Sequence, residues 1–252
     1  ESLAEMEGIV KDLKGSAAGL GSDFGTLGGV VADLNTRTGA TGETLEQLST
    51  DVLNMSRLTG TDASNNVALL TRVMGDWGVE TENASGLMDQ IFGASQAFGI
   101  GVDDVSRKVV QFGAPMRQMG FNLEESIALF GKWEKEGVNA ELAIGSLRIA
   151  AGNFAREGVD LRDGLRDTME AIKGASTESE ALNIAMETFG ARAGPDMAAA
   201  IREGRFELDE AIAALQGTDG ALADASERSL TFGERFQIMK DRALTGLMPI
   251  GD

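Results

Sequence analysis

Apolar side chains recur every three or four residues along most of the chain beyond residue 40, and this spacing constrains the fold more than any other feature. Residues three and four apart share one face of an α-helix, whereas the apolar face of a strand takes every second residue. The clearest stripes are Leu45, Leu48, Val52 and Met55; Val67, Leu70, Met74 and Trp77; and Val105, Val109, Phe112, Met116 and Met119. Similar stripes follow within residues 123–133 and 161–172. No stretch of alternating apolar and polar residues is as clear as these stripes, so we predict an all-α fold.

A glycine followed by an apolar residue ends one predicted helix after another. Glycine adopts the left-handed backbone conformation at a helix end without steric cost, and the next apolar side chain can contact the last turn. An Asp, Asn or Glu follows each pair within three residues, as expected where the next helix begins. The pairs are Gly78-Val79, Gly99-Ile100, Gly120-Phe121, Gly137-Val138 and Gly158-Val159. We therefore expect short helices joined by glycine-capped turns.

These glycines recur at intervals of 21 residues, apart from one interval of 17 between Gly120 and Gly137. Regular spacing of this kind is typical of stacked helical hairpins, as in a solenoid. The side chains between the stops do not repeat, however, which favours an irregular multi-helix bundle. We take the bundle as our prediction and keep the solenoid as the alternative.

Differences in composition suggest three regions. Residues 1–35 combine a short amphipathic run with a stretch rich in glycine, serine and alanine, which predicts a linker or a loosely packed helical arm. Residues 36–220 are expected to form a helical core domain. Residues 221–252 predict a long amphipathic helix that leaves the bundle and continues into a further C-terminal part. Because the sequence starts at Glu1 rather than at methionine and stops directly after a helical run, we expect both chain ends to be internal to a longer protein. Later helices are predicted at 176–189, 194–203, 207–216 and 221–248.

Charge and composition exclude several classes of function. The chain has 22 basic and 40 acidic side chains and a net charge of −18, so it repels duplex DNA and is not expected to read a nucleic-acid sequence. It has no cysteine and no histidine, which excludes disulfides, thiolate metal sites and the commonest general base. No apolar stretch approaches the ~18 residues of a membrane-spanning helix. We predict a protein that is not an enzyme, with no catalytic residue, cofactor, metal or membrane span.

Two pairs of adjacent carboxylates, Asp103 with Asp104 and Glu124 with Glu125, are the candidates for a Ca²⁺ site or an acid–base couple. Adjacent residues on a helix point in different directions. Each pair also lies in the first turn of a predicted helix, where the helix dipole favours negative charge. We therefore interpret both pairs as part of helix starts.

The most distinctive string of the sequence runs from residue 189 to residue 197. It combines a stop glycine, a short loop and a Gly-Pro pair, and proline is tolerated at the first position of a helix. This pattern predicts a tight connection between two helices, and it contains no group suited to catalysis. We single out six residues as a rigid turn or a contact between copies of the chain: Phe189, Gly190, Arg192, Gly194, Pro195 and Asp196.

This string, continued through residue 207, closely resembles the signature region of phage tail tape measure proteins. Other stretches resemble successive parts of the same family, and they occur in the family's order. They are residues 32–42, 57–62 (Arg-Leu-Thr-Gly-Thr-Asp), 73–78, 112–115 with 120–121, and 135–139. The resemblance covers about residues 30–250.

The resemblance implies a mostly helical structural protein of the virion, located in the lumen of the tail of a long-tailed phage and in the host cytoplasm during assembly. Its length would set the length of the tail, and the tail tube would assemble around it. The implied partners are other copies of itself, the tail tube protein, tail assembly chaperones and distal tail or tip proteins. The protein would leave the particle ahead of the DNA at infection.

A compact bundle raises a difficulty for this role, because several copies would fit poorly in a tube lumen of roughly 40 Å, about four helix diameters. We therefore expect the region to unroll into long helices inside the tail or to lie where the channel widens. The alternative function is a free-standing helical adaptor or solenoid that binds partner helices. The eleven methionines and eleven phenylalanines would then form adaptable binding faces, rather than the core that their spacing favours.

Overall fold

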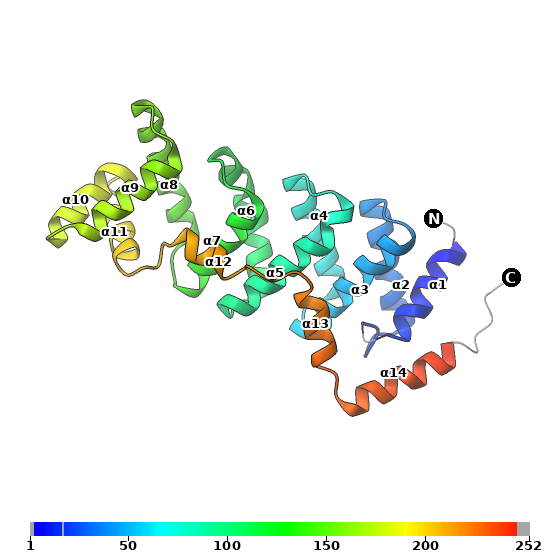
Figure 1. Cartoon of the computed structure of the whole chain (residues 1–252). Helices are drawn as coiled ribbons and strands as arrows, with labels where there is room; N and C mark the ends of the chain where they lie inside the picture. The colour runs from blue at the N-terminus through cyan, green and yellow to red at the C-terminus, as the bar shows by residue number, and fades with distance from the viewer. Residues whose placement is uncertain (1–2, 17, 246–252) are drawn as a thin grey trace. The chain divides into compact units, whose positions relative to one another are not determined.

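The computed structural model of the chain describes residues 3–16 and 18–245, and every regular element within these ranges is a helix (Figure 1). The predicted all-α, multi-helix fold is confirmed. No helix in the described ranges is both long enough and apolar enough to cross a membrane. In chain order the helices are α1 (Leu3–Lys14), α2 (Phe24–Thr38), α3 (Gly42–Thr59), α4 (Ala63–Trp77), the 3₁₀ helix η1 (Thr81–Asn83), α5 (Ala84–Phe98), α6 (Val102–Gln118), α7 (Leu123–Lys135), α8 (Ala140–Glu157), α9 (Leu161–Gly174), α10 (Glu178–Phe189), α11 (Gly194–Arg202), α12 (Leu208–Ala213), α13 (Ala221–Arg228) and α14 (Phe232–Thr245).

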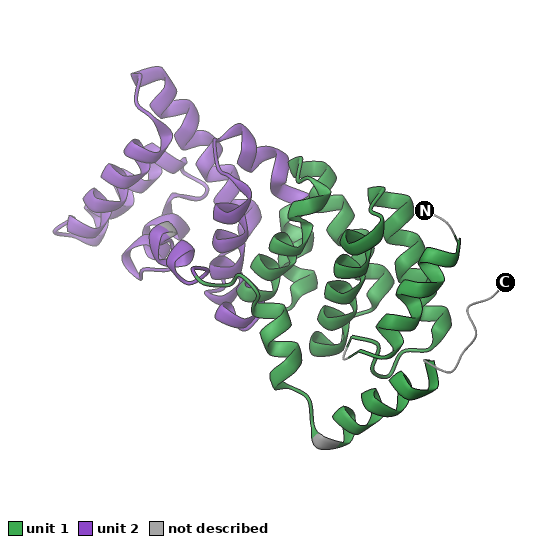
Figure 2. Cartoon of the chain, turned by 45° about the vertical axis from the view of Figure 1, so that its right-hand side comes forward, with its two compact units in different colours: residues 1–93, 101–110, 217–252 green, residues 94–100, 111–216 purple. Residues whose placement is uncertain are grey.

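The chain forms two compact units (Figure 2). Unit 1 comprises residues 1–93, 101–110 and 217–252, and unit 2 comprises residues 94–100 and 111–216. Within unit 1, α13 packs against α3 and α14 packs against α1, far away in the sequence, and the three regions expected from composition stay a prediction. This includes the expectation that residues 36–220 form one helical core domain.

Unit 1 is built on helices α1 to α4, which pack against one another. The stretch 1–35, expected to be a linker or loose arm, contributes two helices in its described part, and four apolar residues of α2 (Leu27, Val30, Val31 and Leu34) are buried. Glycine and alanine between these apolar residues do not prevent the helix, because packing of its apolar face outweighs their weak propensity. The Asp23 carboxylate accepts a hydrogen bond from the Thr26 N–H (2.7 Å) and caps α2.

Unit 2 contains α7 to α12, in which helices close in sequence pack side by side and α12 packs against α7. Its core includes an aromatic series in which ring centroids lie 6.0 Å apart for Phe112 and Phe130 and 5.8 Å apart for Phe130 and Trp133. Phe206, from the segment before α12, stacks on Trp133 at 5.3 Å. The stripe residues Phe130 and Trp133 are therefore core, as their spacing predicts.

The glycine stops form as predicted. All five glycines have φ between 67° and 84°. The N–H of the apolar residue after each glycine donates to a carbonyl oxygen in the last turn of the preceding helix, as with Val159 N–H to Phe154 O (2.9 Å) and Val138 N–H to Trp133 O (2.8 Å). These bonds satisfy carbonyl groups that a helix end otherwise leaves without partners.

The C-terminal helix differs from the prediction of one helix over 221–248. It is divided into α13 and α14, and the Thr231 and Glu234 pair explains the break. The Thr231 N–H donates to Glu234 Oε2 (2.7 Å) and the Glu234 N–H donates to Thr231 Oγ1 (3.3 Å), a reciprocal arrangement that starts a new helix. Within its described residues α14 packs on α1, rather than leaving the bundle, and Arg242 Nε donates to Gly15 O (2.7 Å). Residues 246–248 of the predicted helix lie outside the described residues.

Candidate functional site

The structure brings the six singled-out residues together in the connection between α10 and α11, within unit 2. Phe189 ends α10 and is fully buried. The Gly190 N–H donates to Met186 O (3.0 Å) and the Gly194 N–H donates to Gly190 O (2.8 Å). Gly190 has φ of 85° and ψ of 154°, a region that side-chain-bearing residues rarely adopt. The connection is therefore a tight turn whose backbone geometry requires glycine.

Gly194 lets α10 and α11 approach closely. A Cβ at this position would lie 2.8 Å from Met186 Cα and 2.7 Å from Met186 Cγ. The first of these neighbours is backbone, so it cannot move aside without separating the helices. Gly194 is accordingly buried in this helix hairpin.

The remaining three residues of the turn face solvent. Arg192, Pro195 and Asp196 are all exposed, and Pro195 lies in the first turn of α11. Asp196 also lines a cavity of about 240 Å³ together with Arg205. The turn thus has a buried half that explains its glycines and an exposed half that offers one cation and one carboxylate to a partner. Its role as a contact between copies stays a prediction.

Asn153 on α8 supports this turn and was not predicted. Its Nδ2 donates to the carbonyl oxygens of Glu187 and Thr188 (both 3.1 Å), in the last turn of α10. These carbonyls have no partner within the helix, so the side chain acts as a C-cap supplied by another helix. No local pattern signals this role, because the contact joins residues 34 and 35 positions apart.

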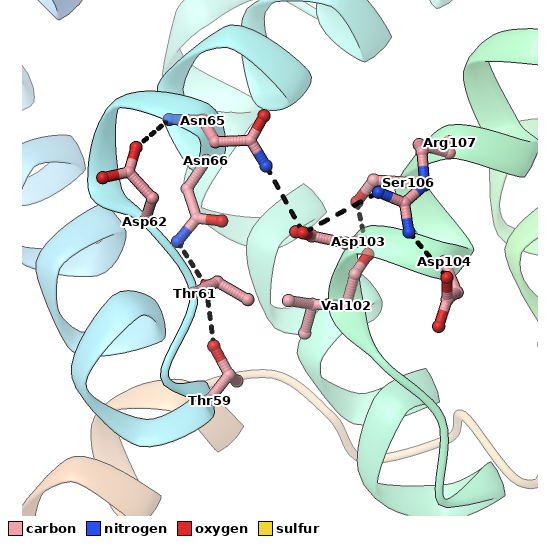
Figure 3. Close-up of polar contacts among 10 residues, drawn as sticks. All are labelled: Thr59, Thr61, Asp62, Asn65, Asn66, Val102, Asp103, Asp104, Ser106 and Arg107. Atoms are coloured by element: carbon pink, nitrogen blue, oxygen red, sulfur yellow. Dashed lines mark hydrogen bonds and ion pairs between the residues drawn. The ribbon is translucent and has the colours of Figure 1, made fainter.

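The motif at residues 57–62 comprises the end of α3 and the turn to α4, and it carries a polar network (Figure 3). Asp62 Oδ1 accepts from the Asn65 N–H (2.8 Å) and caps α4. Thr61 Oγ1 lies 2.8 Å from Thr59 Oγ1 and accepts from Asn66 Nδ2 (2.9 Å). The motif therefore fixes the geometry of a turn, and the network contains no arrangement of nucleophile and base.

The carboxylate pair Asp103 and Asp104 begins α6 beside this turn. Asp103 Oδ2 accepts from Asn65 Nδ2 (3.4 Å) and lies 3.9 Å from Arg107 Nη1, while Asp104 Oδ1 lies 2.7 Å from Arg107 Nη2 (Figure 3). Both carboxylates thus share one arginine. Within the described residues, no group of three or more acidic, histidine or cysteine side chains could hold a metal ion.

In the second pair, Glu125 has a structural partner and Glu124 is exposed. Glu125 and Asn122 form a reciprocal capping box at the start of α7, which confirms the helix-start interpretation. Arg162 Nη1 and Nη2 each donate to one oxygen of Glu125 at 2.7 Å, and this bidentate pair, with the cap, lowers the pKa of Glu125 below its ordinary value. The Arg162 guanidinium also lies 5.5 Å from the ring centroid of Phe121. The pair therefore joins α9 to the start of α7.

Comparison with known proteins agrees with the structural roles that these residues have in capping and joining helices. No curated protein matches the chain. The family described as phage-related minor tail protein matches residues 11–191, from α1 into the α10–α11 turn and more than half of the chain. The chain therefore belongs to the phage-related minor tail protein family, and its role is that of a structural component of a phage tail.

Proposed function

We propose that the chain is part of the tape measure protein of a long-tailed phage. In this role it sets the length of the tail, templates assembly of the tail tube and is released ahead of the DNA at infection. Family membership over residues 11–191 carries the proposal, together with the ordered motifs that resemble tape measure proteins. The proposed location is the tail lumen, and the proposed partners are other copies, the tube protein, assembly chaperones and distal tail proteins.

Two physical properties support this role. A net charge of −18 disfavours binding of the protein to DNA, so a protein of this kind would not hold DNA in the conduit. A helical chain also converts residue number into length at a constant rise of about 1.5 Å per residue when its helices are extended end to end.

The two compact units must be reconciled with a lumen of roughly 40 Å. We propose that the helices separate and align along the tail axis, or that this region lies where the channel widens. Separation would expose apolar faces now buried in the two cores, and it would leave the hydrogen bonds within each helix intact. Neighbouring copies or the tube wall would then have to cover those faces.

Tail length in a duplication and a deletion of residues 40–78 tests the proposal. This segment runs between the left-handed glycines Gly39 and Gly78 and contains α3 and α4. If the segment is extended in the tail, adding or removing its about 40 residues lengthens or shortens the tail by about 60 Å, at about 1.5 Å per residue. Negative-stain micrographs of the particles measure both changes. Tails of unchanged length in both variants would contradict a measuring role for this segment.

One observation favours the alternative function of a helical adaptor. Unit 2 has a groove of about 340 Å³, in which charged residues border five apolar ones: Phe121, Leu129, Leu165, Met169 and Phe206. A groove of this kind suits one face of a partner helix. The adaptor function predicts that tail length does not respond to the duplication, so a lengthened tail in the same micrographs would exclude it.

A further inference from the structure

Helix α14 has an outer face that no described residue of unit 1 covers. Its inner side contacts α1, where Asp241 is buried, and Ile238 is half-buried. On the opposite side, Phe236 is 56% exposed, Met239 60% and Leu244 50%. Three large apolar side chains on one helix face are typical of a surface that is covered in an assembly.

The charges of α14 are distributed unevenly: Arg242 bonds to Gly15 on the side of α1, while Lys240 and Arg235 lie on or beside the outer face. Of the acidic residues, Asp241 is buried near Lys14, and Glu234 bonds to Thr231 at the helix start. The exposed cation Lys240 lies among the apolar residues of the outer face, at 3.6 residues per turn, and Arg235 flanks them. A basic, apolar face on a chain of net charge −18 calls for an acidic, apolar partner surface.

The groove of unit 2 has the size for such side chains. Its floor is formed by the five apolar residues Phe121, Leu129, Leu165, Met169 and Phe206, and its volume is about 340 Å³. A cavity of ~150 Å³ holds one benzene molecule, so this groove has room for about two large side chains.

The rim of the groove leaves acidic groups available. Its cations are already paired: Arg162 with Glu125, Arg166 with Asp163, and Lys173 with Glu207. Glu170 and Asp209 also line the groove, are exposed, and have no ion pair among the described residues.

We infer that the outer face of α14 docks into the unit 2 groove of a second copy of the chain. Phe236 and Met239 enter the groove, and Lys240 and Arg235 approach Glu170 and Asp209. The two surfaces differ, so each copy can accept one neighbour and donate to another, and the contact extends from copy to copy. This inference does not rest on the tape measure role, because a helical adaptor could assemble in the same way.

Sedimentation of the 252-residue chain over a range of concentrations tests the inference. The wild-type chain is expected to form dimers and longer oligomers. Phe236→Glu on the helix and Met169→Glu in the groove should each weaken association at least roughly tenfold, as expected for loss of an anchoring side chain. Phe24→Glu is the matched control, because Phe24 is 41% exposed in the first turn of α2, and it should leave association unchanged.

Mixing the two single variants gives the sharpest readout. Each retains one intact surface, so the mixture should form dimers that cannot extend further. The charge reversals Lys240→Glu and Glu170→Lys provide a second pair that does not alter the apolar floor, and their mixture should associate more strongly than either alone.

Three results would overturn the inference. If the chain stays monomeric at every concentration, the partner of the α14 face is not a second copy. Association that Phe24→Glu weakens as much as Phe236→Glu does would come from another surface. Binding to phosphatidylglycerol vesicles that Phe236→Glu abolishes, in a chain that does not self-associate, would assign the face to an anionic lipid surface.

Discussion

The C-terminal segment (residues 204–245) is attached to the two units by different chemistry. On unit 2, its residues up to 216 are held mainly by apolar packing. Phe206 stacks on Trp133, and Ala211 and Leu215 are buried. The ion pair between Lys132 and Glu210 (2.7 Å) adds a polar contact at the edge.

On unit 1, the rest of the segment is held mainly by hydrogen bonds, with Leu222 as its buried apolar contact. Arg57 donates to Ser226 Oγ (2.7 Å) and to Ser229 Oγ (3.0 Å). The carboxylate of Asp89 on α5 accepts from the backbone N–H groups of Gly220 (2.8 Å) and Leu222 (3.0 Å), and so caps α13.

This difference determines how each attachment opens. Burial of a large aromatic side chain contributes several kcal/mol, whereas a single hydrogen bond that replaces one to water contributes about 0.5–1.5 kcal/mol net. We therefore expect residues 204–216 to open with the core of unit 2. Helices α13 and α14 should open locally, before unit 1 unfolds.

The largest effect should come from Trp133→Ala. Trp133 is fully buried between Phe130 and Phe206, so the substitution leaves a cavity and should lower the free energy of unfolding of unit 2 by about 3–5 kcal/mol. Urea unfolding measures this change. The exposed Phe24→Ala is the control and should stay within about 0.5 kcal/mol. A loss below about 1 kcal/mol for Trp133→Ala would show that the aromatic series does not hold the segment.

Arg57→Met tests the polar attachment. It removes the charged hydrogen bonds to Ser226 and Ser229, and it should lower the free energy of local opening of α13 by about 1.5–3 kcal/mol. Hydrogen exchange should quicken in α13 and stay unchanged in α7. Arg72→Met removes an exposed pair with Asp76 on α4 and is the matched control. Equal acceleration throughout unit 1 would mean that the segment does not open independently.

Gly194→Ala extends the comparison to a contact within unit 2 that depends on backbone proximity. The added Cβ would meet the Met186 backbone, so we expect a loss of about 1–3 kcal/mol in the free energy of unfolding. Gly152→Ala in α8 has open space around its Cβ and should instead be neutral or stabilise by up to about 1 kcal/mol. Thermal unfolding compares the two, and equal effects would contradict a close approach at Gly194.

The contribution of Asp51 to the stability of unit 1 is expected to fall as pH rises. Burial raises the pKa of its carboxyl, with hydrogen bonds from Ser85 and Gln47 acting in the opposite direction. The stabilising contribution of the protonated form is therefore complete below the ordinary pKa of 3.8 and is lost as pH rises through the folded-state pKa. Asp51→Asn should remove this dependence and stabilise unit 1 at neutral pH. Unchanged stability of the variant at pH 7 would argue against a desolvated carboxylate.

Glu125 in unit 2 predicts the opposite dependence, with the smallest effect. Its pKa is lowered, chiefly by the Arg162 hydrogen bonds, so its contribution is present above the ordinary pKa of 4.5 and is lost as pH falls through the folded-state pKa. Glu125→Gln should flatten the acid side of the unfolding curve of unit 2. Hydrogen exchange in mild acid measures both effects, on α7 amides in Glu125→Gln and on unit 1 amides in Asp51→Asn. The comparison would reveal whether the stabilities of the two units respond to pH in opposite directions.

Local sequence patterns specify most of the helices and their stops. A left-handed glycine and the following apolar residue bond to the preceding turn, so partners such as Val159 and Phe154 are five residues apart and their pattern is legible along the chain. The capping pair of Thr231 and Glu234 was equally local, but the apolar spacing around it predicted a continuous helix. The α10–α11 turn was predicted because its glycines and proline are adjacent.

Which helix faces meet depends on long-range contacts in the folded protein. Arg57 reaches Ser226 across 169 residues, Asn153 caps α10 from another helix, and the groove of unit 2 takes its walls from separate segments of the chain. Many apolar stripes of similar composition could pair with one another, so composition does not specify the partner. Shape, close backbone approach at Gly194 and the pairing of buried polar groups select among them, and these arise only when the helices pack.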